Sequence, residues 1–207
     1  MHEHQDYAYL LHQYCKEGPI MFRGIQYYPV IDLGVSQIYL NENKLNNIQK
    51  WFDPTDLSNF DPLPVHNFGN GKLTLTDGHT RAFWAYTMGI KELPIVYDSD
   101  DIVASETGKK LYKNSITWCE HFKIHSVSDL KDRIISDLLY NELWIGRCDK
   151  SYNLLMQTTE AQRNKWQSMF PNLYLYGANE NLTLLFFENK QGVSFDIPLP
   201  VEGGSRL

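Results

Sequence analysis

The chain has 207 residues, of which 43% are hydrophobic and 21% are charged, a composition typical of a folded globular protein. Its net charge of -6 argues against broad, non-specific binding to the phosphates of nucleic acid. No apolar stretch is long enough for a transmembrane helix, and no signal peptide is apparent. We therefore expect a cytoplasmic protein without a membrane anchor.

The three cysteines, Cys15, Cys119 and Cys148, lie far apart in the sequence. No two of them form a C-x-x-C pair, so the pattern indicates neither a zinc ribbon nor a thioredoxin-type redox site. We expect buried free thiols, as is usual in a reducing compartment.

Four segments are predicted along the chain. Residues 1–24 contain a helix, because apolar residues recur at helical spacing between residues 4 and 16. Residues 25–100 begin with two strand-like stretches, IQYYPVIDLG and VSQIYL, and a helix in NENKLNNIQKWF. Residues 101–171 are predicted to be helical, and residues 172–207 to form a small antiparallel β region and a tail.

The most regular pattern lies between residues 62 and 98. PLPVHNF and LTLTD are predicted strands joined by the turn GNGK, and His66 is expected at the surface of the first of them. HTRAFWAYTMG follows as a helix that ends at Gly89, and KELPIVYD as a further strand. This sequence of elements predicts a compact α/β unit.

Two capping boxes, Ser126 with Asp129 and Thr159 with Gln162, predict helix starts in the second half of the chain. The first box precedes LKDRIISDLLYNELW, which is predicted to be helical. From residue 172 the stretches LYLYG, LTLLFFE and VSFDIPL predict a small antiparallel sheet. The expected fold class is therefore α+β.

A cluster of polar residues lies where a strand is followed by a helix, in the stretch TLTDGHTRAFWAY. The first N–H groups of a helix lack intrahelical partners and, with the positive end of the helix dipole, favour anions. Gly78 lets a ligand approach the backbone because it has no Cβ. His79 and Thr80 add polar side chains, and Arg81 adds a planar guanidinium suited to phosphate oxygens. Residues 78–81 are therefore candidates for a phosphate site.

An alternative without a ligand stays open for the same residues. Asp77 would then cap the helix, Arg81 would pair with a surface carboxylate, and His79 would be solvated. Next to a phosphate, the carboxylate of Asp77 would be repelled unless a divalent cation lay between them. Asp77 is therefore a candidate partner, direct or indirect, of Mg²⁺.

The stretch LTLTDGHTRAFWAYTMGIKELPIVYD resembles the core of the ParB/sulfiredoxin superfamily. In that superfamily a strand leads into a G-x-x-R loop at a helix N-terminus, and a proline-containing strand follows; Pro94 lies in the corresponding strand here. The resemblance covers residues 25–100. It implies a ParB/sulfiredoxin-like α/β core in which Gly78, His79, Thr80 and Arg81 bind nucleotide phosphates.

Two branches of the superfamily fit the motif poorly. ParB-like partition proteins carry G-E-R-R, whereas this chain has His79 and Thr80 between Gly78 and Arg81. Sulfiredoxins require a reactive cysteine where this chain has His79. DNA binding or nuclease activity is the third-ranked function, because the chain is acidic and shows no clear helix-turn-helix segment.

The form D-G-H-T-R is closer to the free serine kinases of the superfamily, which transfer a phosphoryl group from a nucleotide to L-serine. The resemblance implies ATP or ADP with Mg²⁺ as cofactors, donation from His79 to a phosphate oxygen, and a catalytic glutamate upstream of the motif. The matching position is Glu42, which would accept the proton of the substrate hydroxyl. As an alternative, Glu42 is an exposed carboxylate favoured at a helix start by the dipole.

The leading prediction is therefore a phosphotransferase whose partners are a nucleotide and a small hydroxylated substrate. A nucleotide-binding regulatory module without catalysis is the second alternative. Whether the chain forms a homodimer stays open.

Overall fold

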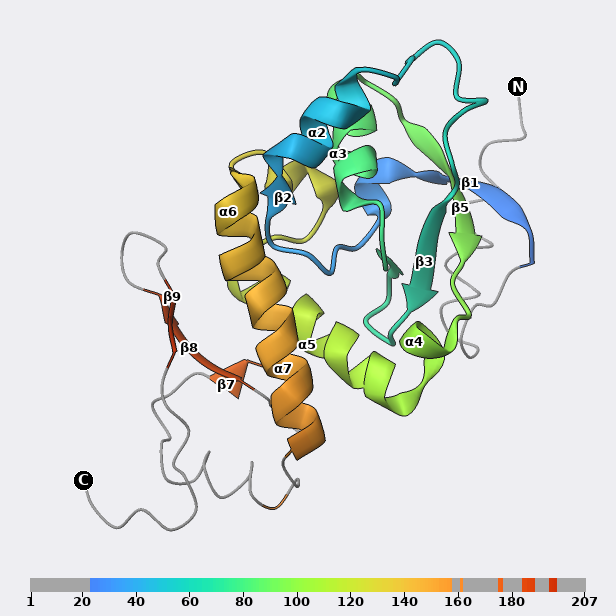
Figure 1. The fold of residues 1–207 in the computed structure, drawn as a ribbon. Coiled ribbons are helices and arrows are strands. Elements are labelled where there is room, and N and C mark those ends of the chain that lie inside the picture. The colour runs from blue at the N-terminus through green and yellow to red at the C-terminus, as the bar shows by residue number, and fades with distance from the viewer. Residues whose placement is uncertain (1–22, 158–160, 162–174, 177–183, 189–193, 197–207) are drawn as a thin grey trace, which may run out of the picture.

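The computed structural model describes residues 23–157, 161, 175–176, 184–188 and 194–196 (Figure 1). Within these residues, helices and a mixed sheet form an α+β fold, as predicted. The helix predicted between residues 4 and 16 and the capping box of Thr159 with Gln162 lie outside the described residues.

A four-stranded sheet forms the centre of the fold. Its spatial order is β1 (Ile25–Pro29), β5 (Glu92–Tyr97), β3 (Leu63–Asn67) and β4 (Leu73–Leu75). The pairs β1–β5 and β3–β4 are antiparallel, whereas β3 and β5 run parallel. In the register of the hairpin, Val65 lies opposite Leu75. The hairpin predicted around GNGK is confirmed.

His66 is buried, whereas the sequence predicts it at the surface of its strand; that prediction is wrong. Its ring lies between Phe68, at 4.7 Å, and Tyr97, at 5.0 Å between ring centroids. Its Nδ1 is 2.7 Å from the carbonyl oxygen of Asp98 and donates to it, because a carbonyl only accepts. The alternation of apolar and polar residues along β3 predicted one exposed face. The residue that follows β5, Asp98, contacts His66 on that face and helps to bury it.

The strand predicted in VSQIYL is much shorter than expected. The short 3₁₀ helix η1 (Val30–Asp32) follows β1, and only β2 (Leu40–Asn41) is a strand in the next segment. Between them, Gly34 forms an isolated parallel bridge with Thr74. The N–H of Gly34 donates to Leu73 O, and Leu75 N–H donates to Gly34 O. This segment therefore continues the sheet beyond β4 at a single position.

Helices α2 (Glu42–Gln49) and α3 (His79–Thr87) pack against each other (Figure 1). The cap of α2 is Asn41, whose side chain accepts from Lys44 N–H at 3.0 Å. The buried apolar residues of the two helices are Leu45, Ile48, Ala82, Phe83 and Ala85. As predicted, α3 ends just before Gly89, which has a φ of 85°.

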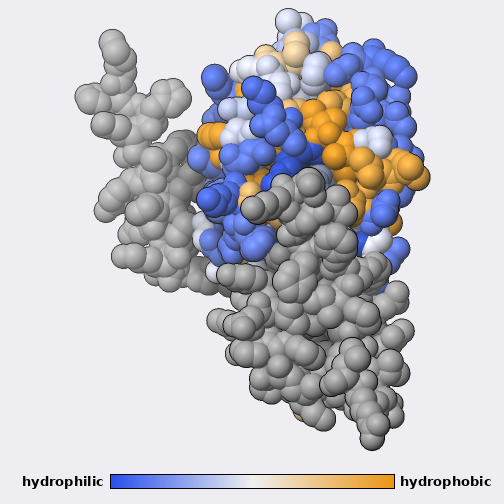
Figure 2. All heavy atoms as spheres, turned by 90° about the vertical axis from the view of Figure 1, so that its left-hand side faces the viewer, coloured by the Kyte–Doolittle hydropathy of each residue, from blue (hydrophilic) through white to orange (hydrophobic). Residues whose placement is uncertain are grey.

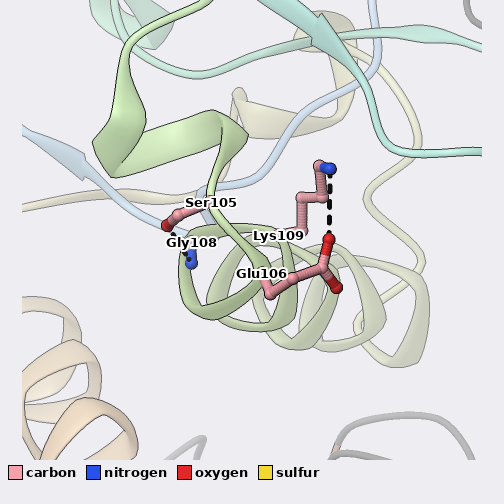
Figure 3. A network of polar contacts seen from close by, with 4 residues as sticks. All are labelled: Ser105, Glu106, Gly108 and Lys109. Atoms are coloured by element: carbon pink, nitrogen blue, oxygen red, sulfur yellow. Dashed lines mark hydrogen bonds and ion pairs between the residues drawn. The ribbon is translucent and has the colours of Figure 1, made fainter.

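Helix α4 (Asp101–Ala104) turns directly into α5 (Glu106–His121), which confirms helical structure after Asp98. Ser105 caps α5 by accepting from Gly108 N–H at 3.1 Å, and Lys109 pairs with Glu106 at 3.3 Å (Figure 3). A Cβ on Gly108 would lie 2.0 Å from the carbonyl oxygen of Ile102. Glycine at this position therefore lets α4 cross the start of α5 at close range.

The prediction of one long helix after Ser126 is wrong for residues 127–135. Ser126 and Asp129 do form the capping box, but they start only the 3₁₀ helix η2 (Val127–Leu130). The chain then extends into β6 (Ile134–Ile135), which pairs in parallel with β2. Two consecutive β-branched residues favour a strand, and β2 provides its backbone partner.

A second serine begins the helix that does form. Ser136 accepts from Leu139 N–H at 3.4 Å and starts α6 (Asp137–Tyr140). The chain continues through the π-helical turn η3 (Asn141–Ile145) into α7 (Gly146–Gln157). Figure 2, viewed from the side of α6, shows hydrophobic areas among hydrophilic ones. Leu138 and Ile145 are among the exposed apolar side chains of this helical run.

The described C-terminal strands pair as an antiparallel sheet, as predicted. They are β7 (Leu175–Tyr176), β8 (Leu184–Glu188) and β9 (Ser194–Asp196), in that order. Among the other described residues, one main apolar core joins the four-stranded sheet to the helices. Trp118 of α5 and Trp144 of η3 meet edge to face within it, at 6.1 Å between ring centroids.

Candidate functional site

The helix N-terminus predicted to hold an anion is not capped by a side chain. Gly78 is the N-cap residue of α3, with φ 77° and ψ 14°, in the left-handed region that favours glycine. In the part of the chain that the structure describes, no side-chain oxygen accepts from the first turn. Asp77, the capping residue of the alternative interpretation, is exposed and does not cap the helix. The first N–H groups of α3 therefore stay available to a ligand.

The guanidinium of Arg81 folds back over this helix start. A Cβ on Gly78 would lie 2.6 Å from Leu63 Cδ2 and 3.1 Å from Arg81 Nη2. Glycine therefore leaves the space that the guanidinium occupies. Arg81 Nη1 donates to the carbonyl oxygen of Asp61 at 2.8 Å, and its guanidinium lies 5.8 Å from the ring centroid of Phe60.

The alternative without a ligand predicted that Arg81 pairs with a surface carboxylate, and Asp61 is such a neighbour. Arg81 Nη1 lies 4.0 Å from Asp61 Oδ2, and the Asp61 side chain is 94% exposed. A pair of this length with one partner almost fully exposed contributes little to stability. Within the described residues, Nη2 and Nε of Arg81 have no hydrogen-bond partner, and the Arg81 side chain is 20% exposed.

His79 is buried, with 3% of its surface exposed. Its Nε2 accepts from the backbone N–H of Ser36 at 3.1 Å. Because a backbone N–H only donates, Nε2 carries no proton, and the neutral ring is protonated on Nδ1. Burial lowers the pKa of His79 to about 4, against a smaller opposing effect of Asp77. The imidazole is therefore uncharged at neutral pH, and the solvated histidine of the alternative is wrong.

Nδ1 of His79 has no hydrogen-bond partner among the described residues. Donation from this ring to a phosphate oxygen stays a prediction, with Nδ1–H as the one ring donor left for it. Thr80 is also buried, and its hydroxyl makes no hydrogen bond to another described residue.

Glu42 is the first residue of α2 and is exposed. It makes no hydrogen bond or ion pair with a described residue, so its predicted catalytic role rests on the packing of α2 against α3 alone. In the described part of the chain, no three His, Cys, Asp or Glu side chains come together as a metal site. Asp77, the predicted Mg²⁺ partner, stands at the uncapped end of α3.

A pocket of about 250 Å³ adjoins the loop. Thr76 and His79, on either side of Asp77 and Gly78, line it together with Ser36. Most of the other lining residues come from α5, η3 and α7, which the sequence did not indicate as part of the site. They include Tyr112, Ser115 and Trp118 from α5, Trp144 from η3, and Cys148 and Ser151 from α7.

Hydrogen bonds tie the helical side of the pocket to the strand that leads into the loop. Tyr112 Oη donates to Thr76 O at 3.1 Å, and Thr76 Oγ1 donates to Asp98 Oδ2 at 2.5 Å. The sequence signal for this pocket is weak because Ser36, Thr76 and Tyr112 lie far apart along the chain. The one sequence feature that indicates the pocket is the presence of polar residues on the otherwise apolar face of α5.

Cys119 and Cys148 are free thiols, Cys119 buried and Cys148 half-buried, as the sequence predicted for the cysteines. Burial raises the pKa of both thiols, that of Cys148 to about 12. Cys15 lies outside the described residues.

No protein-family model matches the sequence, and no curated protein matches it. In the described residues, no helix is both long and apolar enough to cross a bilayer.

Proposed function

We propose that residues 77–81 bind the phosphates of a nucleotide. The observation that carries this proposal is the guanidinium of Arg81 beside the uncapped N-terminus of α3. The helix dipole, the first backbone N–H groups and a planar cation then converge on one point, which favours a polyanion. Gly78, which has no Cβ, leaves room for the guanidinium beside this helix start.

The activity that fits this site best is phosphoryl transfer to a small hydroxylated substrate, resembling that of the free serine kinases. Catalysis of this kind consists of positioning and of neutralising negative charge. Arg81 and the N–H groups of α3 would hold the nucleotide phosphates. The acceptor oxygen bonds to the terminal phosphorus, the bridging P–O bond breaks, and Glu42 takes the hydroxyl proton.

Mg²⁺ fits the residues at this helix end. A single exposed carboxylate, Asp77, lies directly before Gly78. Sites for nucleotide-bound Mg²⁺ use one or two carboxylates together with the phosphates themselves. The ion, when bound, would screen the repulsion between Asp77 and the nucleotide.

A regulatory module that binds a nucleotide without transfer is the second candidate. The exposure of Glu42 and its lack of a described partner favour it. Catalytic carboxylates are usually held in place by neighbouring groups, and nothing of this kind is described around Glu42.

Binding of ATP, ADP and tripolyphosphate, measured by calorimetry with and without Mg²⁺, tests the phosphate site. We expect Arg81→Gln to weaken binding by about tenfold or more, the effect of losing a charged bidentate donor. Arg23→Gln is the control, because Arg23 is exposed and its loss changes the net charge equally. An unchanged affinity in Arg81→Gln, or equal losses in both variants, would overturn the site.

Incubation of the same nucleotides with a panel of hydroxy amino acids, followed by mass spectrometry, separates the two candidates. A phosphorylated product that disappears in Glu42→Gln, with nucleotide binding retained, supports the kinase. Nucleotide binding without any product supports the regulatory module. A product formed equally well by Glu42→Gln would show that another group accepts the proton.

A further inference from the structure

The pocket beside the loop is lined by uncharged groups throughout its described part. None of the described lining residues is Asp, Glu, Lys or Arg. Its titratable groups are also neutral at pH 7, because burial lowers the pKa of His79 to about 4 and raises those of Tyr112 and Cys148 to about 12. Charged groups lie behind this lining, where Asp98 accepts from Thr76 and the Arg147 guanidinium lies 5.3 Å from the centroid of the Trp118 ring. Because the lining itself carries no charge, the pocket favours a neutral ligand group.

The polar groups of the pocket comprise several hydroxyl oxygens, which can accept a hydrogen bond, and a buried donor. Three lining hydroxyls already donate to backbone carbonyls: Ser36 to Leu75 O, Tyr112 to Thr76 O and Ser115 to Leu111 O. Their oxygens can still accept. Nδ1–H of His79 is a buried donor without a described partner. An unpaired buried donor is costly, and a ligand with an acceptor atom would relieve that cost.

Aromatic rings form much of the wall. Tyr112, Trp118 and Trp144 all line the pocket. Trp144 lies on the π-helical turn η3, an irregularity found often at functional sites. Trp118 and Trp144 are 1% and 7% exposed and pack against each other, so the half-buried Tyr112 is the ring with most surface left to contact a planar heterocycle.

We propose that this pocket binds the base of the nucleotide, with donor groups of the base facing the hydroxyl oxygens of Ser36 and Ser115. A planar, neutral heterocycle carrying both donors and acceptors matches the neutral aromatic wall and its hydroxyl oxygens. His79 connects the two parts of the site, because its backbone lies at the start of α3 and its ring lines the pocket. The inference rests on the proposed function for the phosphate half of the ligand.

Nucleosides without phosphate test the pocket separately from the loop. Adenosine, guanosine, cytidine and uridine are titrated into the full-length protein, with ribose and tripolyphosphate alongside. Ser115→Leu places an apolar side chain in the pocket. Thr117→Leu is its matched control, because both hydroxyls bond the carbonyl four residues earlier, at 3.1 and 3.0 Å, and Thr117 does not line the pocket.

We expect at least one nucleoside to bind and ribose not to. Ser115→Leu should weaken nucleoside binding about tenfold, while Thr117→Leu leaves it within about twofold. Tripolyphosphate binding should be the same in both variants. If Ser115→Leu does not fold, as judged by circular dichroism, Leu111→Phe fills the same pocket.

Absence of nucleoside binding, or equal losses in Ser115→Leu and Thr117→Leu, would overturn the base pocket. Tripolyphosphate binding without nucleoside binding overturns the pocket and leaves the proposed phosphate site intact. Nucleoside binding without tripolyphosphate binding supports the pocket and overturns the phosphate site.

Discussion

The imidazole of His79 accepts a hydrogen bond from the backbone N–H of Ser36, at 3.1 Å across 43 positions of sequence. This contact joins the first residue of α3 to the segment that precedes β2. It also fixes the tautomer of the ring, with the proton on Nδ1. The position of the candidate phosphate loop therefore depends on a neutral, buried histidine.

Acidification should destabilise the protein through His79. Its pKa falls from 6.5 to about 4 on folding because burial disfavours the charged ring, so the unfolded chain binds more protons between these values. The stability is therefore fully present above pH 6.5 and is lost as the pH falls towards 4. Between pH 7.5 and 5.5 we expect the free energy of unfolding, measured in urea, to fall by about 1 kcal/mol from this residue.

His79→Gln isolates this contribution. The amide oxygen of glutamine can accept from Ser36 N–H, but the side chain does not titrate. The decrease between the two pH values should therefore be about 1 kcal/mol smaller in His79→Gln than in the native protein. Equal decreases in both proteins would show that His79 is not buried in neutral form.

Gly78→Ala should be more destabilising than Gly89→Ala. Both glycines have positive φ, 77° and 85°, so alanine is strained in either place by about 1 kcal/mol. Only at Gly78 would the new Cβ meet other atoms, Leu63 Cδ2 at 2.6 Å and Arg81 Nη2 at 3.1 Å. The steric overlap should add about 1–3 kcal/mol in urea unfolding. Equal effects of the two substitutions would show that the space above Gly78 is not restricted.

Local patterns predicted the parts of the fold whose partners are close in sequence. The β3–β4 hairpin and α3 follow from alternation, turn residues and helical spacing within residues 62–89. The parallel pair β2–β6 was missed because Leu40 and Ile134 meet only in the folded chain. For a two-residue strand, periodicity provides almost no signal.

In the candidate site, too, the features that are local in sequence were predicted and those that depend on tertiary contacts were not. Gly78 and Arg81 are close in sequence, so the sequence alone indicated them, whereas only the structure shows that Asp77 does not cap the helix. The contact of Arg81 with Asp61 and the pocket wall from α5 and η3 depend on tertiary packing. Burial of His79 was missed because helix-start residues are usually exposed, and its cover comes from residues around Ser36.

Gly108→Ala should show whether α4 must cross α5 at close range. A Cβ at this position would lie 2.0 Å from Ile102 O and 3.0 Å from Val103 O, both backbone atoms that cannot rotate away. Alanine is otherwise the better helix former by about 1 kcal/mol. We expect a net loss of stability of about 1–3 kcal/mol in thermal or urea unfolding. A stabilised variant would mean that α4 moves aside without cost.

Asp61→Asn should strengthen phosphate binding. The carboxylate of Asp61 lies 4.0 Å from Arg81 Nη1 and, being negative, competes with any anion at the start of α3. The bond from Arg81 to the backbone oxygen of Asp61 does not involve that side chain, so the arginine should keep its place in the variant. We expect tripolyphosphate affinity to rise about two- to fivefold at low salt and to approach the native value as salt screens the charge. Asp132→Asn, at an exposed carboxylate with the same charge change, controls for net charge. A fall in affinity in Asp61→Asn alone would show instead that the carboxylate orients the guanidinium for the ligand.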